Sequence, residues 1–191
     1  MKIDPAFLAF DIDGVVADTM SLFLAIAEKD FGISHIRYED ITDYDLRQYD
    51  GVDEAVMWEI ILRILEGKYA LPLYPIAHAP EVLQRIIGSR RQMLFVTARP
   101  AGDHIAEWLC SVLDVEADCL DVVATGSFED KKEVLAERNI SHFVEDRLET
   151  CYLLAEAGIQ PIVFSQPWNR KKHPFPEVSS WLELESMIAL E

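Results

Sequence analysis

Positive charge and cysteine are both scarce in this sequence of 191 residues. Lys and Arg together number 17 against 34 Asp and Glu, so the formal net charge is −17 at pH 7. A surface this acidic repels nucleic acids and anionic membranes, and we expect neither as a partner. The three cysteines, Cys110, Cys119 and Cys151, lie apart without a C-x-x-C pair. This pattern argues against a disulfide framework and predicts a reducing, cytoplasmic location.

Long apolar runs are also missing. Asp4, Pro5 and Asp11 interrupt the apolar residues near the start of the chain, so we predict no secretory signal peptide. No apolar run reaches the roughly 20 residues that a membrane-spanning helix needs. The hydrophobic fraction of 50% is nevertheless typical of a globular chain, and the length suits one domain with a small insertion. An anionic substrate of so acidic a protein would require local cations from a metal, Lys or Arg.

From residue 81 onward, short apolar runs alternate with helical patterns. Runs at 92–97, 120–125, 142–144 and 161–164 predict buried strands, and the segments 103–113, 131–138 and 148–157 predict helices. This alternation is typical of right-handed βαβ units and therefore of a Rossmann-like α/β fold with a parallel sheet. Residues 17–78 lack strand signals and carry helical patterns at 21–31 and after Asp53. We therefore predict an α/β core of residues 1–16 and 79–191, with a small helical cap, residues 17–78, inserted after the first strand.

The first apolar run ends in Asp11, and Asp13 and Gly14 follow. Gly14 lets the chain turn, and the carboxyl ends of strands are where open α/β sheets bind their ligands. Two carboxylates this close repel each other and need a cation or a shared proton. Three further strand ends carry polar chemistry, at Thr97, in the segment before residue 131, and at residues 145–146. The sequence therefore predicts one polar site at one edge of the sheet.

These segments resemble the four motifs of the haloacid dehalogenase superfamily, in its phosphatase branch. They are D-x-D-G-V-V-A-D-T from Asp11, V-T-A-R from Val96, a lysine at 131 or 132, and F-V-E-D-R from Phe143. The D-G-V-V-A-D stretch, together with the later F-S-Q-P-W-N-R from Phe164, is similar to the 5′(3′)-deoxyribonucleotidase-like branch. The resemblance implies hydrolysis of a phosphomonoester with Mg²⁺ as the cofactor.

The resemblance also implies roles for the acidic residues. Asp11 would be the nucleophile that forms an aspartyl-phosphate, and Asp13 the general acid that later becomes the base. Asp11, the carbonyl of Asp13 and Asp146 would ligate Mg²⁺ through oxygen, with Glu145 acting through water. Hydrolytic dehalogenases of the same fold lack the second acid and the metal, so Asp13 and Asp146 argue against that reaction.

The remaining motif residues would hold the phosphate. Thr97 and the amide of Ala98 are expected to bind phosphate oxygens, and Arg99 either clamps an anion or pairs with the cap. One of Lys131 and Lys132 would neutralise charge on the nucleophile and the transferring group. We choose Lys131 because it stands at the start of its predicted helix.

The cap should select the leaving group. Its aromatic residues are Phe23, Tyr38, Tyr44, Tyr49, Trp58 and Tyr69, and we expect one or two of them to face the site. The nucleotidase-like branch has an aromatic residue just after D-G-x-x-A-D, where this chain has Thr19. The expected substrate is a small phosphorylated metabolite, with nucleoside monophosphates as the leading candidates. A sugar or other metabolite phosphatase and a non-catalytic phosphate-binding regulatory protein are the alternatives.

Three other charged positions receive structural interpretations. Asp18 is expected to cap the first helix of the cap segment. Arg147 is expected to pair with Glu149 or another surface acid. The basic run at 170–172 is interpreted as a solvated loop or as a contact for an anionic substrate.

Overall fold

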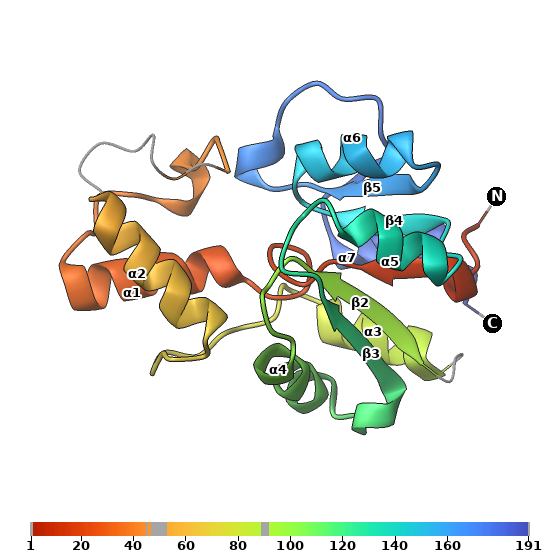
Figure 1. Cartoon of the computed structure of the whole chain (residues 1–191), viewed down its shortest axis with the longest axis horizontal. Helices are drawn as coiled ribbons and strands as arrows, with labels where there is room; N and C mark the ends of the chain where they lie inside the picture. Colours follow the sequence, from red (N-terminus) through yellow and green to blue (C-terminus); the bar gives the residue numbers. More distant parts are fainter. Residues whose placement is uncertain (1, 45, 47–52, 89–91, 191) are drawn as a thin grey trace.

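A parallel sheet of six strands forms the centre of the computed structural model, which describes residues 2–44, 46, 53–88 and 92–190. The order of the strands is β3-β2-β1-β4-β5-β6, and every pairing is parallel (Figure 1). The strands are β1 (Leu8–Phe10), β2 (Met93–Thr97), β3 (Leu120–Ala124), β4 (His142–Glu145), β5 (Gln160–Phe164) and β6 (Glu177–Val178). The predicted parallel α/β sheet is thereby confirmed.

Helices cover both faces of the sheet. Successive side chains of a strand point to opposite faces, so an apolar strand has side chains to bury on each face. Leu8 and Phe10 pack on the face covered by α3 (Ala79–Gly88), α4 (Asp103–Leu113) and α7 (Trp181–Met187). Ala9 and Phe143 pack on the other face, against α5 (Lys131–Glu137) and α6 (Leu148–Glu156). The central strands β1, β2 and β4 are buried on both sides, which explains why their sequences read as continuous apolar runs.

Two helices, α1 (Thr19–Phe31) and α2 (Glu54–Leu65), pack against each other to one side of the sheet (Figure 1). Asp18 caps α1 by accepting from the Ser21 amide at 3.1 Å, and Asp53 caps α2 by accepting from the Ala55 amide at 2.7 Å. The predicted cap at Asp18 is confirmed, and the helical pattern that follows Asp53 forms α2. Gly32, with φ of 69°, ends α1 in a left-handed conformation that suits glycine.

The segments through which the chain enters and leaves this pair of helices lie side by side. The Asp18 amide donates to the Tyr74 carbonyl at 2.9 Å, and the Ile76 amide donates to the Val16 carbonyl at 2.8 Å. The chain therefore leaves the sheet after β1 and returns beside the same point. This arrangement places α1 and α2 over the carboxyl end of β1.

The C-terminal part of the fold differs from the prediction. The sequence patterns indicated no element after β5, yet the short 3₁₀ helix η5 (Pro167–Asn169), β6 and α7 follow it. A two-residue strand and a helix of two turns are too short for hydrophobic periodicity to identify them. At the other end, Pro5–Phe7 forms the 3₁₀ helix η1, and β1 begins at Leu8. Among the described helices, none is both long and apolar enough to cross a bilayer.

Candidate active site

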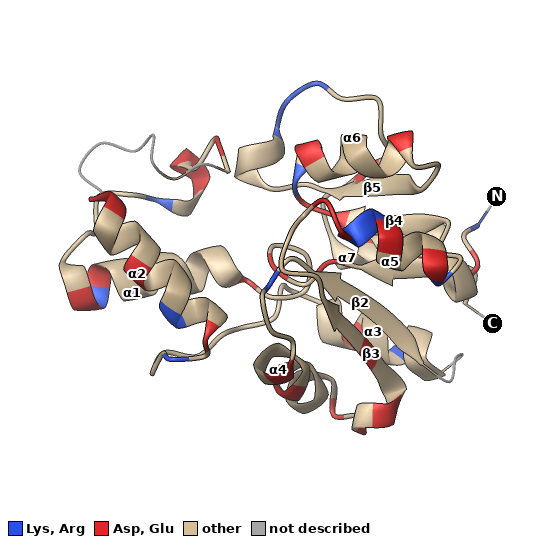
Figure 2. Cartoon of the chain, viewed as in Figure 1, with Lys and Arg blue, Asp and Glu red and all other residues tan. Residues whose placement is uncertain are grey.

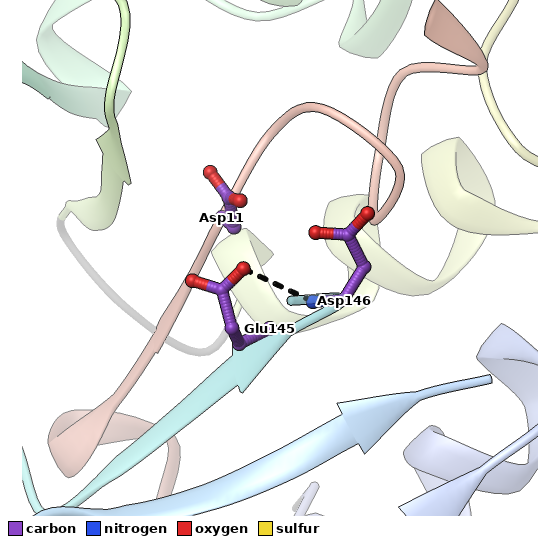
Figure 3. Close-up of side chains that lie close together, drawn as sticks. All are labelled: Asp11, Glu145 and Asp146. Carbon is purple, nitrogen blue, oxygen red and sulfur yellow. Dashed lines mark hydrogen bonds between the residues drawn. The ribbon is translucent and has the colours of Figure 1, made fainter. Parts of the chain in front are cut away.

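Three carboxylates meet at the carboxyl ends of β1 and β4. Phe10 pairs with Val144 in the parallel register, so Asp11 emerges beside Glu145, and Asp146 follows directly. Figure 3 shows the three side chains converging, and one oxygen of each lies within 4.8 Å of the others. All three are nearly inaccessible to solvent. The two adjacent strands therefore bring Asp11 next to two acids that follow it by more than 130 residues in the sequence.

Lys131 lies inside this acidic cluster. Its Nζ is 2.9 Å from Asp11 Oδ2 and 2.9 Å from Glu145 Oε2, and its side chain is fully buried. Burial alone lowers the pKa of Lys131, but the two facing carboxylates outweigh it and hold that pKa above its ordinary value. Lys132, the neighbour considered for the same role, is half-buried on the next face of α5.

The pKa values of two acids in the cluster are raised well above the usual carboxyl range. For Asp11 the main cause is burial, which Lys131 only partly opposes. For Asp146 burial is again the main cause, followed by repulsion from Glu145 and Asp11. Repulsion from neighbouring carboxylates adds to the effect of burial on the pKa of both acids.

Glu145 is largely occupied by protein donors. Its Oε2 accepts from Lys131, and its Oε1 accepts from the backbone amides of Asp146 at 3.2 Å and Arg147 at 3.1 Å. These two amides belong to the turn that follows β4, so their hydrogen bonds to Glu145 fix that turn. Glu145 thus orients both the lysine and the turn that carries Asp146.

Asp13 and Arg99 form a bidentate ion pair. Arg99 Nε lies 2.9 Å from Asp13 Oδ2, and Nη2 lies 2.7 Å from Oδ1. The Thr19 hydroxyl also donates to Asp13 Oδ1, at 2.5 Å. Burial acts to raise the pKa of Asp13, but the Arg99 guanidinium prevails and lowers it. Arg99 Nη1 donates to the Ile64 carbonyl in α2 at 3.2 Å, so the arginine contacts the predicted cap segment rather than facing open solvent.

Thr97 and Ala98 lie at the carboxyl end of β2. The Thr97 hydroxyl accepts from the Arg99 amide at 3.2 Å, which fixes the tight turn after the strand. The Thr97 carbonyl accepts from the amide of Thr125 at 2.9 Å, which ties this turn to the end of β3. Thr97, Ala98 and Arg99 all line the same pocket as Asp11 and Asp13.

This pocket has a volume of about 840 Å³ and extends from the carboxylates to α1 and α2. The side chains that α1 and α2 contribute are mostly apolar: Met20, Phe23, Met57, Trp58, Ile61, Ile64 and Leu65. Of the aromatic residues expected near the site, Phe23, Tyr44 and Trp58 line the pocket. Tyr38 and Tyr69 contact other groups, and Tyr49 lies outside the described residues. The pocket therefore joins a charged end to an apolar end.

Arg147 lies at the wall of the pocket. Its guanidinium stacks 4.3 Å from the centroid of the Phe128 ring and 5.5 Å from that of Tyr44. Its Nε lies 3.6 Å from a carboxylate oxygen of Glu149, in agreement with the expected pair. The stacking connects the turn after β4 with the loop before α5 and with the segment before α2.

Trp168 and Asn169 contact Asp146 but received no role from the sequence patterns. Trp168 lines the pocket and donates from its indole Nε1 to Asp146 Oδ2 at 2.9 Å. Asn169 donates to the Asp146 carbonyl at 2.7 Å. Both belong to the F-S-Q-P-W-N-R stretch. Their position just after the end of β5 was a usable signal, because strand ends converge on the site in this class of fold.

The donor set fits a divalent cation. Among the described residues, Asp11, Asp13 and Glu145 make ion pairs with two cations, Lys131 and Arg99, so together with Asp146 four ionised carboxylates would exceed these cations by two charges. Hard oxygen ligands of this kind are those that Mg²⁺ prefers. Gly14 keeps the site open, because a Cβ at this position would lie 2.2 Å from Asp146 Oδ2. Asp11, Glu145 and Asp146 could therefore hold a metal ion.

Comparison with known proteins agrees with this geometry. The family described as "5' nucleotidase, deoxy (Pyrimidine), cytosolic type C protein" matches residues 5–191. "Putative nucleotidase BH1399" of Halalkalibacterium halodurans is 23% identical over 184 residues, which cover 93% of this chain and 90% of the relative.

Solved structures share the fold at low sequence identity. A haloacid dehalogenase-like family hydrolase from Streptococcus pneumoniae aligns with a TM-score of 0.58 and 13% identity, covering 94% of this chain and 96% of that chain. A hydrolase from Pseudomonas syringae aligns with a TM-score of 0.60 and 11% identity, covering 96% and 97%. Since the family match extends over almost the entire sequence, this chain belongs to the 5′ nucleotidase, deoxy (pyrimidine), cytosolic type C family and is a phosphatase of the haloacid dehalogenase fold.

Proposed function

We propose that the protein hydrolyses deoxynucleoside monophosphates in a Mg²⁺-dependent reaction that passes through an aspartyl-phosphate on Asp11. The observation that carries the proposal is the position of Asp11 at the charged end of the pocket, between Lys131 and Asp146. Its Oδ2 contacts Lys131, and its Oδ1 accepts from the Ile12 amide at 2.7 Å. These two contacts fix the orientation of the carboxylate, which supports its proposed attack on phosphorus.

In the first step, the Asp11 carboxylate attacks phosphorus and the alcohol of the nucleoside leaves with a proton from Asp13. In the second step, Asp13 takes a proton from a water molecule that attacks the aspartyl-phosphate, which releases phosphate. Arg99 lowers the pKa of Asp13 in the ligand-free site. A phosphate dianion next to Asp13 acts in the opposite direction and favours the protonated acid that the first step needs.

Charge stabilisation comes from the surrounding residues. Lys131 neutralises charge on Asp11 and on the phosphoryl group during transfer. Thr97 and the amide of Ala98 are assigned to the phosphate oxygens, in keeping with their place in the pocket wall. Mg²⁺ held by Asp11, Asp146 and the Asp13 carbonyl would supply further positive charge at the phosphate when bound.

Residues 17–78 would act as a cap that selects the leaving group. Among the described residues, the α1 and α2 lining is apolar except for Thr19 and the Trp58 indole N–H. Thr19 is already bonded to Asp13. Such a wall suits the flat apolar face of a nucleobase better than a polyhydroxylated sugar, whose hydroxyls would lose hydrogen bonds to water there. We place the activity in the cytoplasm, in keeping with the cytosolic type of the family and with the three unpaired cysteines.

The test is a comparison of kcat/KM with Mg²⁺ for deoxynucleoside, ribonucleoside, hexose and triose monophosphates, measured by phosphate release. Deoxynucleoside monophosphates should be the most efficient group. Asp11→Asn, purified in the same way, is the control that excludes a contaminating phosphatase. Efficient turnover of the sugar phosphates without turnover of any nucleotide would refute the nucleotidase assignment and leave the phosphatase one.

A further inference from the structure

The segment that follows β5 is unusually well buried for a loop. Gln166 is 6% exposed, Trp168 4% and Asn169 1%. The Gln166 amide donates to Asn169 Oδ1 at 2.9 Å, and the Asn169 amide donates to the Gln166 carbonyl at 3.1 Å, so the turn is closed on itself. Buried polar side chains need hydrogen-bond partners, and each of these three side chains has at least one partner in the candidate active site.

Two of the three side chains fix Asp146. Trp168 Nε1 donates to Asp146 Oδ2 at 2.9 Å, and Asn169 Nδ2 donates to the Asp146 carbonyl at 2.7 Å and to the Phe164 carbonyl at 2.8 Å. An indole N–H can only donate, so Trp168 orients the carboxylate and cannot itself ligate a metal. Asn169 joins the backbone of Asp146 to the end of β5. Together they set both the position and the rotation of the Asp146 carboxylate.

The third side chain fixes the turn after β1. Gln166 Nε2 donates to the Gly14 carbonyl at 2.7 Å, and its Oε1 accepts from the Tyr38 hydroxyl at 2.8 Å. The Trp168 ring also covers Gly14, since an added Cβ there would lie 3.2 Å from its Cζ2 atom. The turn of Asp11 to Gly14 and the Asp146 carboxylate are thus held by the same segment.

Further contacts hold this segment against residues 38–43. The rings of Tyr38 and Trp168 have centroids 5.8 Å apart. The basic loop after η5, blue in Figure 2, pairs with the acidic segment through Arg170–Glu39 and Lys171–Asp43, each at 3.0 Å. These exposed pairs contribute little energy, so the buried hydrogen bonds of Gln166, Trp168 and Asn169 are the main restraint.

We propose that Gln166, Trp168 and Asn169 are positioning residues that hold the Asp11–Gly14 turn and Asp146 at the spacing needed for a divalent cation. The inference rests on the proposed Mg²⁺ dependence. It assigns no chemical step to the three side chains. Their removal should weaken Mg²⁺ binding much more than substrate binding, because Trp168 and Asn169 contact Asp146 and Gln166 holds the turn that carries Asp11 and Asp13.

Trp168→Phe is the main test, because it keeps an aromatic ring and removes the N–H donor together with the five-membered ring that carries it. Loss of a partner that orients a metal ligand typically weakens metal affinity by about 10–100-fold. Trp108→Phe is the matched control: the Trp108 indole donates to the Leu73 carbonyl at 3.0 Å, away from the acidic cluster. The Kd for Mg²⁺ is measured by calorimetry without substrate, and the Mg²⁺ concentration for half-maximal activity is measured separately.

The expected result is a Kd for Mg²⁺ raised about 10–100-fold in Trp168→Phe and unchanged within about twofold in Trp108→Phe, with the KM for substrate nearly constant at saturating Mg²⁺. If Trp168→Phe fails to fold by circular dichroism, Gln166→Met is measured instead, with the same expected increase. An unchanged Kd in the folded variant overturns the inference and leaves the proposed function standing. Absence of Mg²⁺ binding by the unmodified protein overturns the metal dependence in the proposed function itself.

Discussion

Replacement of Lys131 by Met tests the centre of the site. The substitution keeps an apolar stem of similar length and removes a buried ammonium that contacts two carboxylates at 2.9 Å each. Removal of one partner from a buried ion pair costs about 3–5 kcal/mol, because the remaining charge is left without compensation. In a chain of this size, 1 kcal/mol corresponds to about 2–4 °C, so Tm should fall by about 6–20 °C.

Turnover should fall as well. Donors that stabilise developing charge contribute about 10²–10³ in kcat, and Lys131→Met should lose at least that factor with the best substrate. Lys132→Met is the matched control, because Lys132 is adjacent in sequence and half-buried. A substitution at such a position changes stability by about 0.5 kcal/mol or less, and kcat should stay within about twofold.

The stability loss should also depend on pH. Burial, opposed by Lys131, already raises the pKa of Asp11. Without the lysine this pKa rises further. Above the ordinary carboxyl pKa of about 4, the folded variant then binds more protons than the unfolded chain, so its stability decreases as pH rises. The Tm difference from the unmodified protein should therefore be larger at about pH 8 than at about pH 5.

The assays are phosphate release and thermal unfolding of both variants over this pH range. Equal losses of kcat in the two variants, or a larger loss in Lys132→Met, would refute the assignment of Lys131. A Tm for Lys131→Met that matches the unmodified protein at every pH would refute the argument from buried charge.

Three further predictions concern the turn after β1 and the metal. Asp11→Asn should abolish turnover without lowering Tm, since it removes a buried negative charge; phosphate release and unfolding curves decide this, and retained turnover would contradict the nucleophile assignment. Gly14→Ala should lose Mg²⁺ affinity and stability, because Gly14 has φ of +74° and an added Cβ would lie 2.2 Å from Asp146 Oδ2. The control Gly158→Ala, with φ of +82° and no atom within 4 Å of the added Cβ, should cost only the backbone strain of about 1–2 kcal/mol and leave Mg²⁺ affinity unchanged. A chelator should abolish activity, and Mg²⁺ at 100 times its Kd should restore it and stabilise the fold by about 2.7 kcal/mol; full activity after verified metal removal would exclude the metal role.

Most of the sheet and its helices could be predicted from local signals. The strands β2 to β5 are apolar runs bounded by turn residues, and α4 occupies residues 103–113 as predicted. Asp18 and Asp53 act as helix caps, because a side chain and an amide two or three residues later interact regardless of the rest of the fold. The end of the chain was not predicted, since β6 and α7 are stable only through packing such as that of Trp181 on Phe10, with ring centroids 5.5 Å apart.

The sequence by itself determined that Asp11, Thr97 and Glu145 lie at one edge of the sheet. The carboxyl ends of neighbouring parallel strands meet at the same edge, so identifying the strands is enough to place the residues that follow them. It did not determine the partners within that edge. Arg99 pairs with Asp13 and with the Ile64 carbonyl, and these contacts depend on how α2 packs above the sheet. The hydrogen bond from Trp168 to Asp146 likewise depends on the path of a loop. Such contacts follow from the long-range packing of whole elements, which local sequence patterns do not encode, and only the tertiary structure decided them.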